Sequence, residues 1–181
     1  MDHTITAMLG SNCLKDTLDF NYIFETYYKR IYNYNYYRLH NQEIAEDLTS
    51  QVFEKVMIKL ESYSKDKAKF EVWLFTIARN ILNDYLRRQK KFIWTSLDDV
   101  FETITKDSLQ EESILQQEQN TLLLEAVRTL NEKERTMIAY KFGADLKNKE
   151  IATLMHMNER HVGVMLHRTL KKLKVAMEGA M

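Results

Sequence analysis

Apolar residues recur at three- and four-residue steps along three stretches in the first half of the chain. The first covers residues 20–38 and is rich in tyrosine. The second covers about 42–62, with apolar residues at strict four-residue steps and with Phe53 and Met57 expected to widen that stripe. A third begins near Phe70, after a lysine-rich link at 64–69. Its apolar positions stay within one narrow arc at about 100° per residue. Three amphipathic helices are therefore predicted, each turning one face to a core.

A second set of apolar repeats begins near Leu122. Asn131 is suited to start a helix, and the helix predicted after it covers 135–142. Residues 149–169 scan as two short helices joined by a tight turn, with Asn158 as the cap of the second. The residues predicted to bury one face of that second helix are Val162, Leu166, Leu170 and Leu173. This spacing is typical of a DNA-binding helix-turn-helix, although any helical hairpin buries similar residues.

The composition favours an all-α fold made of two small helical domains. The 181 residues include four glycines and no proline, which permits long uninterrupted helices. No apolar run approaches the roughly 20 residues that a membrane span needs, and the N-terminus lacks the basic-then-apolar pattern of a secretory signal. We therefore expect a cytoplasmic protein. Cys13 is the single cysteine, which excludes an internal disulfide.

The sequence carries no pattern for catalysis, for a metal ion or for a cofactor. It lacks paired carboxylates, a nucleophile beside a base, and a Gly-rich phosphate loop. His156, His161 and His167 lie close in sequence, but no carboxylate or thiolate completes a ligand set with them. A non-enzymatic protein without a metal, a cofactor or a small-molecule substrate is expected.

The formal net charge is zero, but it is the sum of unlike parts. Residues 20–92 hold thirteen Lys/Arg against nine Asp/Glu, residues 93–121 hold one against seven, and residues 122–181 hold eleven against seven. Each basic block is a candidate surface for nucleic-acid phosphates. The predicted organisation is a short lead at 1–19, a first helical domain at 20–92, an acidic linker at 93–121 and a second helical domain at 122–181.

One flank of the third helix is polar and basic. At about 100° per residue it gathers Thr76, Asn80, Asn83, Arg87 and Lys90. The helix macrodipole alone also favours cations near a helix C-terminus, so a structural role stays open for them. Trp73 lies at the start of the same helix, near the link lysines, where an aromatic ring among cations suits single-stranded bases. A packing role for Trp73 is an equal alternative.

Three stretches carry a further pattern. They are AEDLTSQVFEKV at 45–56, FEVWLFTIARNILNDYLRR at 70–88, and the helix-turn-helix KEIATLMHMNERHVGVMLHRT at 149–169. In this order they resemble the polymerase-binding helix, the promoter-melting helix and the C-terminal motif of bacterial RNA polymerase sigma factors of the extracytoplasmic-function (ECF) type. The resemblance covers about 20–177, and its middle stretch is the most specific.

The resemblance implies a transcription initiation factor without chemistry of its own. Its first domain would bind the clamp helices of the largest polymerase subunit through Asp47, Leu48, Gln51, Phe53 and Glu54. One of Leu48 and Phe53 is expected to serve core packing only. The residues that would recognise the minus-10 promoter element and hold an extruded base are Lys65, Lys67, Lys69, Trp73, Thr76, Asn80, Asn83, Arg87 and Arg88.

The second domain would place its second helix in the major groove of the minus-35 element. The residues expected at this DNA are Arg160, His161, Gly163, Val164, His167, Arg168 and Lys171. Where the family commonly has a Gly-Thr-Val-Lys-Ser-Arg-like run, residues 160–165 read RHVGVM. Two cations and a hydroxyl are thereby lost, which predicts a divergent minus-35 sequence or a larger share of shape and phosphate contacts.

The partners implied by the resemblance are core RNA polymerase with its clamp helices and flap, promoter DNA, and an inhibitory anti-sigma factor. The acidic linker would thread toward the RNA exit path. The alternative interpretation is a stand-alone helix-turn-helix regulator whose first domain senses a signal or dimerises. Such a regulator would bind duplex DNA without polymerase.

Overall fold

The structure, a computed structural model, describes residues 19–95, 123 and 126–179, with side chains up to Gln89 in the first range. The elements in chain order are α1 (Phe20–Leu39), α2 (Gln42–Lys59), the short 3-10 helix η1 (Leu60–Ser62), α3 (Phe70–Thr95), α5 (Glu132–Ile138), the π-helix η2 (Ala139–Gly143), α6 (Asn148–Leu154) and α7 (Glu159–Glu178). The described residues contain helices and no strand, so the all-α prediction is confirmed. None of these helices is long and apolar enough to span a membrane.

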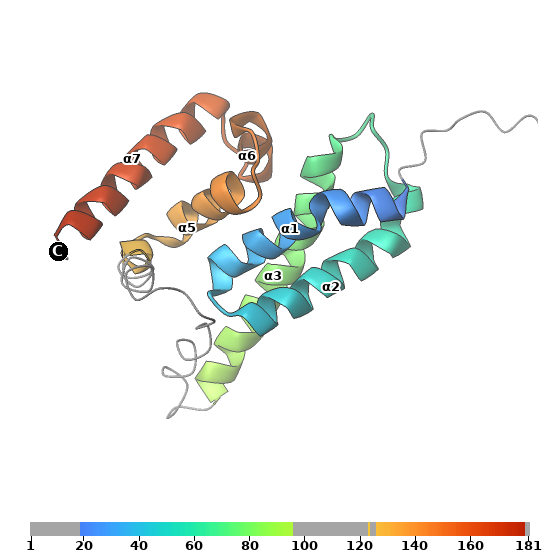
Figure 1. Cartoon of the computed structure of the whole chain (residues 1–181), viewed down its shortest axis with the longest axis horizontal. Helices are drawn as coiled ribbons and strands as arrows, with labels where there is room; N and C mark the ends of the chain where they lie inside the picture. Colours follow the sequence, from blue (N-terminus) through green and yellow to red (C-terminus); the bar gives the residue numbers. More distant parts are fainter. Residues whose placement is uncertain (1–18, 96–122, 124–125, 180–181) are drawn as a thin grey trace, which may run out of the picture.

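The first domain is a bundle of α1, α2 and α3 (Figure 1). The Asp19 side chain caps α1 by accepting from Asn21 N–H at 3.2 Å, and the chain turns at His40, whose φ is 51°. Asn41 then caps α2 by accepting from Ile44 N–H at 2.9 Å. The left-handed C-cap residue His40, followed directly by the N-cap residue Asn41, produces the tight connection between α1 and α2.

The predicted apolar stripes of the first domain meet in one core. Ile23, Ile31, Val52 and Leu74, from all three helices, are completely buried. Met57 was expected to widen the stripe of α2, and that expectation is wrong because its side chain is 59% exposed. At about 100° per residue Met57 lies well outside the arc of Leu48, Val52 and Val56 that α1 and α3 cover.

The second domain begins with a capping box at the start of α5. The Asn131 side chain accepts from Glu134 N–H at 3.0 Å, and the Glu134 carboxylate accepts from Asn131 N–H at 2.9 Å. The helix start predicted at Asn131 is confirmed. The last turns widen into the π-helix η2, where Ala144 N–H donates to Ala139 O at 2.9 Å. This widening brings Tyr140 into the core, where it is completely buried.

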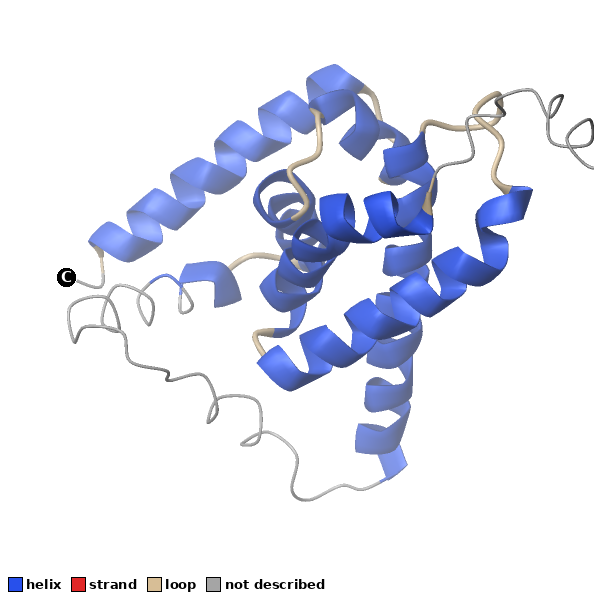
Figure 2. Cartoon of the chain, turned by 45° about the vertical axis from the view of Figure 1, so that its right-hand side comes forward, coloured by secondary structure: helices blue, strands red, loops and turns tan. Residues whose placement is uncertain are grey.

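Helices α6 and α7 form the predicted helix-turn-helix, and Figure 2 shows the short turn between them. The Asn158 side chain accepts from His161 N–H at 2.7 Å, so the predicted cap is confirmed. Val162, Leu166 and Leu173 are buried as expected, but Leu170 is 44% exposed. The buried arc passes instead through Thr169, because Leu170 lies about 70° from the centre of that arc.

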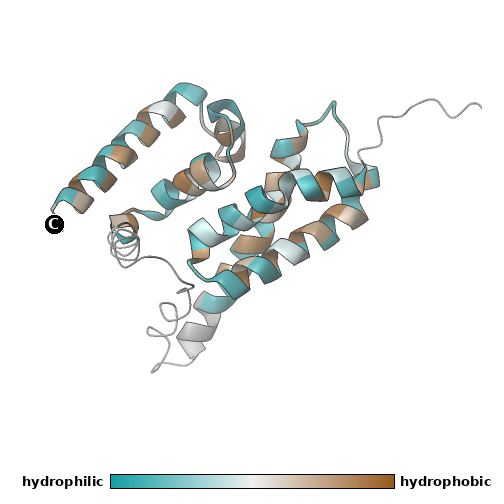
Figure 3. Ribbon diagram, in the orientation of Figure 1, coloured by the Kyte–Doolittle hydropathy of each residue, from teal (hydrophilic) through white to brown (hydrophobic). Residues whose placement is uncertain are grey.

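The two domains pack directly against each other. Helix α1 contacts η2, and α3 contacts α6. Figure 3 shows apolar and polar residues alternating along the helices of both domains, as expected for amphipathic helices. The acidic linker predicted at 93–121 lies outside the described residues except for the last turn of α3, which ends at Thr95.

Glu134 is predicted to stabilise the second domain in a pH-dependent way. Its carboxylate, almost fully buried, accepts a hydrogen bond from Lys172 in α7, and that bond first, with the Asn131 backbone bond, lowers the pKa of Glu134. A lowered folded-state pKa gives stability that is complete above the ordinary glutamate pKa and is lost as the pH falls through the lowered value.

The substitution Glu134→Ala should therefore lower the free energy of unfolding by about 1–3 kcal/mol at pH 7, measured by urea denaturation. The loss should shrink at pH 3, where the wild-type carboxyl is being protonated. Glu178→Ala, which removes an exposed carboxylate from α7, is the control and should have little effect. An equal penalty for Glu134→Ala at both pH values would contradict the assignment.

Candidate functional surfaces

The exposed side of α2 carries acids and an amide at helical spacing. Asp47, Gln51 and Glu54 are exposed, and Gln51 Nε2 donates to Asp47 Oδ2 at 2.8 Å. Leu48 and Phe53, by contrast, are 2% and 4% exposed. Only one of these two was expected to be core alone, but both lie on the side of α2 that faces the bundle. Neither side chain offers surface to a partner in this conformation.

Sequence reasoning missed an apolar side chain in line with those acids. Ile58 is 72% exposed, and it falls with Asp47, Gln51 and Glu54 in an arc of about 60° on α2. The four residues are together called the α2 ridge. The i, i+4, i+7, i+11 spacing could have identified Ile58, but its residue type suggested burial.

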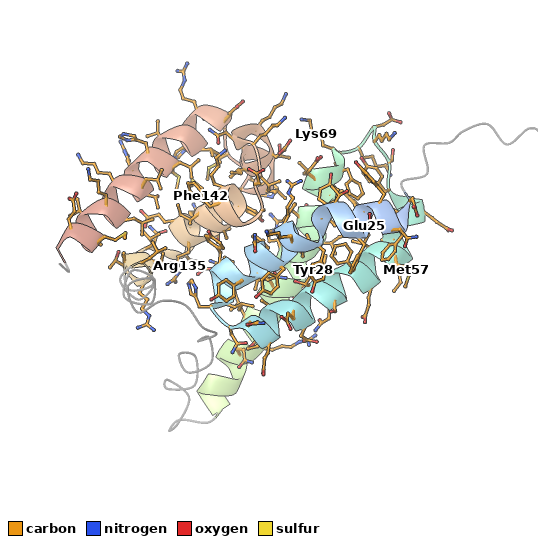
Figure 4. The ribbon with its side chains drawn as sticks, viewed as in Figure 1. Glu25, Tyr28, Met57, Lys69, Arg135 and Phe142 are labelled. Carbon is orange, nitrogen blue, oxygen red and sulfur yellow. The ribbon has the colours of Figure 1, made fainter. Side chains whose placement is uncertain are left out.

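Exposed aromatic surface continues from α2 onto α1. Phe24 is partly exposed, and its ring lies 4.8 Å from the ring of Phe53, centroid to centroid. Tyr28 also packs on Phe53, stacked at 6.1 Å. Figure 4 shows Tyr28 and Met57 over this part of the first domain. Phe53 therefore supports a partly apolar surface from below, even though it is itself buried.

The predicted flank of α3 divides into exposed and packed residues. Asn80, Asn83, Arg87 and Arg88 are exposed. Thr76 is half-buried, and its hydroxyl donates to Val72 O at 2.6 Å within the same helix. That bond satisfies the donor of Thr76, so this residue contributes less to the polar flank than its spacing suggested.

Trp73 packs against two neighbouring rings at the start of α3. Its ring centroid lies 5.1 Å from that of Tyr63 and 5.5 Å from that of Phe70, and the side chain is half-buried. Tyr63 in turn donates its hydroxyl to Ala68 O at 3.0 Å, which fixes the link to the helix. The ring cluster holds the lysine-rich link in place beside α3.

The three lysines of the link are exposed but do not have equal surroundings. Lys65, Lys67 and Lys69 all lie in the loop before α3. Lys69 Nζ lies 3.5 Å from a carboxylate oxygen of Glu150 in α6, and Figure 4 shows Lys69 on the side of the link near α6. One member of the proposed minus-10 set is thus paired with the other domain.

The outer face of α7 gathers the residues expected at duplex DNA. At about 100° per residue the exposed members fall within an arc of about 120°, opposite the buried arc, and they are Arg160, His161, Val164, His167, Arg168 and Lys171. Gly163 lies at the edge of this arc, where a Cβ would meet nothing closer than 3.9 Å. The face combines five potential cations with the apolar residue Val164 and suits a phosphate-lined groove.

No cluster of three potential metal ligands occurs among the described residues. The arrangement consists of three separate surfaces: the acidic and apolar α2 ridge, the polar flank of α3 with its link, and the basic outer face of α7. Such surfaces support binding to a protein and to nucleic acid.

Comparison with known proteins matches both domains. The family described as Sigma-70 region 2 matches residues 23–92, and the family described as Sigma-70, region 4 matches residues 120–173. The ECF RNA polymerase sigma factor SigM of Bacillus subtilis is 28% identical over 152 residues, covering 84% of this chain and 91% of SigM. The ECF RNA polymerase sigma factor BldN of Streptomyces coelicolor is 28% identical over 154 residues, covering 85% of this chain but 58% of BldN. The chain thus spans little more than half the length of that relative.

Two solved structures share the fold. One is the sigma factor RpoE in complex with the anti-sigma factor NepR from Bartonella quintana, with a TM-score of 0.70 and 19% identity over 88% of this chain and 97% of that chain. The other is CnrH in complex with the cytosolic domain of CnrY, with a TM-score of 0.64 and 13% identity over 90% of this chain and 89% of that chain. Both similarities extend over the two helical domains.

Arg168 is predicted to contribute to binding of duplex DNA through phosphate contact. The substitution Arg168→Ala should weaken binding to a random duplex and reduce the slope of log affinity against log salt by about 0.9, as for one lost phosphate contact. Fluorescence anisotropy across a salt series measures both quantities. Lys133→Ala removes one exposed cation from the same domain, away from the α7 face, and should leave the slope unchanged. Equal slopes for Arg168→Ala and wild type would exclude this contact.

Proposed function

Because the chain belongs to the ECF-type sigma factors of bacterial RNA polymerase, we propose that its three surfaces divide the task of bringing the polymerase to promoters. The observation that carries this proposal is their separation: a protein-binding ridge on α2, a polar and basic flank on α3, and a basic face on α7. A stand-alone regulator needs the last of these but has no use for the other two. The region 2 match precedes the region 4 match along the chain, in the order that the sequence motifs indicated.

The α2 ridge would bind core RNA polymerase. Asp47, Gln51 and Glu54 supply acceptors and charge, and Ile58 supplies apolar area on the same arc. An amphipathic partner helix with cations beside an apolar stripe fits this combination. Leu48 and Phe53 would act through the ridge, because they hold α2 against α1 and α3 rather than touch the partner.

The flank of α3 would hold separated promoter strands at the minus-10 element. Asn80 and Asn83 offer amides that can hydrogen-bond a base, and Arg87 and Arg88 offer cations for the neighbouring phosphates. The lysines of the link, Lys65, Lys67 and Lys69, would add to the same electrostatic surface. The half-buried residues Thr76 and Trp73 would lie beneath this surface and support it. An extruded base costs a few kcal/mol of lost stacking, which contacts of this kind offset.

The outer face of α7 would contact the minus-35 element in the major groove. Arg160 and His161 lie at its N-terminal end, where recognition helices meet base edges, and Arg168 and Lys171 follow about two turns or more later. The short side chains at Gly163 and Val164 leave few hydrogen-bonding groups between them. Shape and phosphate contacts would therefore carry much of this recognition.

An anti-sigma factor is the remaining proposed partner. The structures of RpoE and CnrH that share this fold were solved with NepR and with the cytosolic domain of CnrY. The partly exposed aromatic and apolar residues over α1 and α2, including Phe24 and Met57, are a surface that such an inhibitor could cover in competition with polymerase.

Charge reversal on the α2 ridge should weaken polymerase binding. Glu54→Lys is expected to reduce affinity for core RNA polymerase about tenfold, equal to about 1.4 kcal/mol, because it replaces an attractive contact by a repulsive one. A pull-down with purified core enzyme at several concentrations measures the change. Glu61→Lys reverses an exposed acid beyond the end of α2 and serves as the control. Similar losses for the two variants would remove Glu54 from the interface.

Loss of the Asn80 amide should impair strand opening more than duplex binding. Run-off transcription with core polymerase on genomic fragments first identifies a promoter. On that promoter Asn80→Ala should lower open-complex formation about fivefold, as expected for a lost hydrogen bond of about 1 kcal/mol, with closed-complex affinity nearly unchanged. Permanganate reactivity of unpaired thymines reports strand opening. Asn21→Ala, which removes an exposed amide from α1, is the matched control.

Two results would count against these assignments. Equal losses of opening and of duplex binding in Asn80→Ala would exclude Asn80 from the melting surface. Full promoter occupancy by the chain without any polymerase would support the stand-alone regulator instead.

A further inference from the structure

The side chain of Asn148 lies between the two helices of the helix-turn-helix. Asn148 is the first residue of α6, and its Nδ2 comes within 3.9 Å of the position that a Cβ would take on Gly163 of α7. Gly163 lies at the edge of the outer face of α7 and is itself partly exposed. Because no side chain stands at Gly163, the Asn148 amide lies beside the face proposed to contact duplex DNA.

The fold itself makes no use of the Asn148 amide. Neither its Oδ1, which is buried, nor its Nδ2 forms a hydrogen bond within the described part of the chain. The start of α6 does not depend on Asn148, because the Glu150 carboxylate accepts from Lys147 N–H at 2.9 Å instead. An unpaired buried polar atom lowers stability, so its presence needs an explanation outside the contacts of the fold.

Potential cations lie near this amide on the outer side of the motif. Arg160 and His167 lie three residues before and four residues after Gly163, about one helical turn away in each direction, and both are exposed. Lys149, which follows Asn148 in the chain, is exposed as well. An anion placed beside Gly163 on this side would meet the amide together with these cations.

The two neighbouring acids leave that side open to an anion. Glu150 is buried, and one of its carboxylate oxygens lies 3.5 Å from Lys69 Nζ. Glu159 is exposed, but at about 100° per residue it lies on the opposite side of Gly163 from Arg160. The charges around the Asn148 amide therefore favour an anionic ligand on the side of the α7 outer face.

A DNA phosphate is the anion that a helix-turn-helix brings to this place. The second helix of the motif lies in the major groove while the first crosses the DNA backbone, so the junction between them faces phosphates at the edge of the groove. Asparagine side chains are among the usual donors to phosphate oxygens. Gly163 and Val164 offer no side-chain hydrogen bond at this point of α7, and Asn148 would supply the missing donor.

From these observations we infer that Asn148 is a further contact to the minus-35 DNA, with its Nδ2 donating to a phosphate oxygen beside Gly163. The inference rests on the proposed function, since it requires α7 to lie in the major groove. Sequence reasoning missed Asn148 because it directly precedes the 149–169 stretch that carries the motif. The contact gives α6 a share in DNA binding, and it explains the glycine, because a longer side chain at position 163 would stand between the amide and the DNA.

Substitutions of Asn148 in the full chain distinguish its contact from those of the cations. Asn148→Ala should lower the affinity for a random duplex about tenfold, as expected for a lost hydrogen bond to a charged group. The slope of log affinity against log salt should stay unchanged, because a neutral amide releases no counterion. Asn148→Lys should restore affinity at low salt and steepen the slope by about 0.9, as for one added phosphate contact. Fluorescence anisotropy across a salt series measures both quantities.

Thr153→Lys is the matched control for the added charge. Thr153 is exposed on the same helix, about 140° around α6 from Asn148, so a lysine there should leave the salt slope unchanged. Circular dichroism checks that each variant is folded, and if Asn148→Ala unfolds, the slope of Asn148→Lys decides the question. A change of stability alone, without these changes in DNA binding, would indicate a purely structural role for Asn148.

The outcomes separate this inference from the proposed function. Wild-type affinity in Asn148→Ala, a reduced salt slope in that variant, or a slope in Asn148→Lys no steeper than in Thr153→Lys would each overturn the contact. If the wild-type chain bound no duplex even at low salt, the proposed role of the α7 face would be refuted, and this contact with it. Normal duplex binding by the wild type and by both Asn148 variants would refute the Asn148 contact alone.

Discussion

Tyr34 of α1 and Tyr140 of η2 stack with nearly parallel rings where the two domains meet, and the placement of one domain against the other depends on this contact. Burial is the main reason that the pKa of the Tyr34 hydroxyl is well above its ordinary value. Through Tyr34, α1 belongs to two cores, since the same ring meets Phe75 of α3 edge-on at 5.8 Å. The helix that completes the first bundle therefore also positions the second domain.

In the polar contacts around that stack, the first domain supplies the cations and the second domain supplies the acceptors. Backbone carbonyls accept hydrogen bonds from Arg30 and Arg79, and carboxylates form ion pairs with Arg38 and Lys69. Bonds to carbonyls depend little on salt, whereas exposed ion pairs are screened. An interface built from these groups fixes how the two domains are oriented relative to each other.

The local sequence pattern was sufficient to predict the helices and their N-caps, but not to predict which side chains are exposed. Asn131 and Asn158 cap helices as their sequence neighbourhoods indicated, because a cap depends on the two or three residues that follow it. Leu170 and Met57 were misplaced because their apolar residue type suggested burial, although at about 100° per residue both lie off the arc that neighbouring helices cover. Leu48 and Phe53 show the converse, since motif resemblance suggested a surface role where packing against α1 enclosed them.

The sequence by itself determined the all-α fold, the two helical domains and the family, since these follow from periodicity, charge and motif order along the chain. The tertiary structure alone decided that Leu48 and Phe53 are both buried and that Lys69 pairs with Glu150. It alone brought Gly143 against α1, more than a hundred residues away in sequence. The physical reason is that interdomain contacts join residues with no local relation in sequence, and their geometry exists only once both domains are folded and packed.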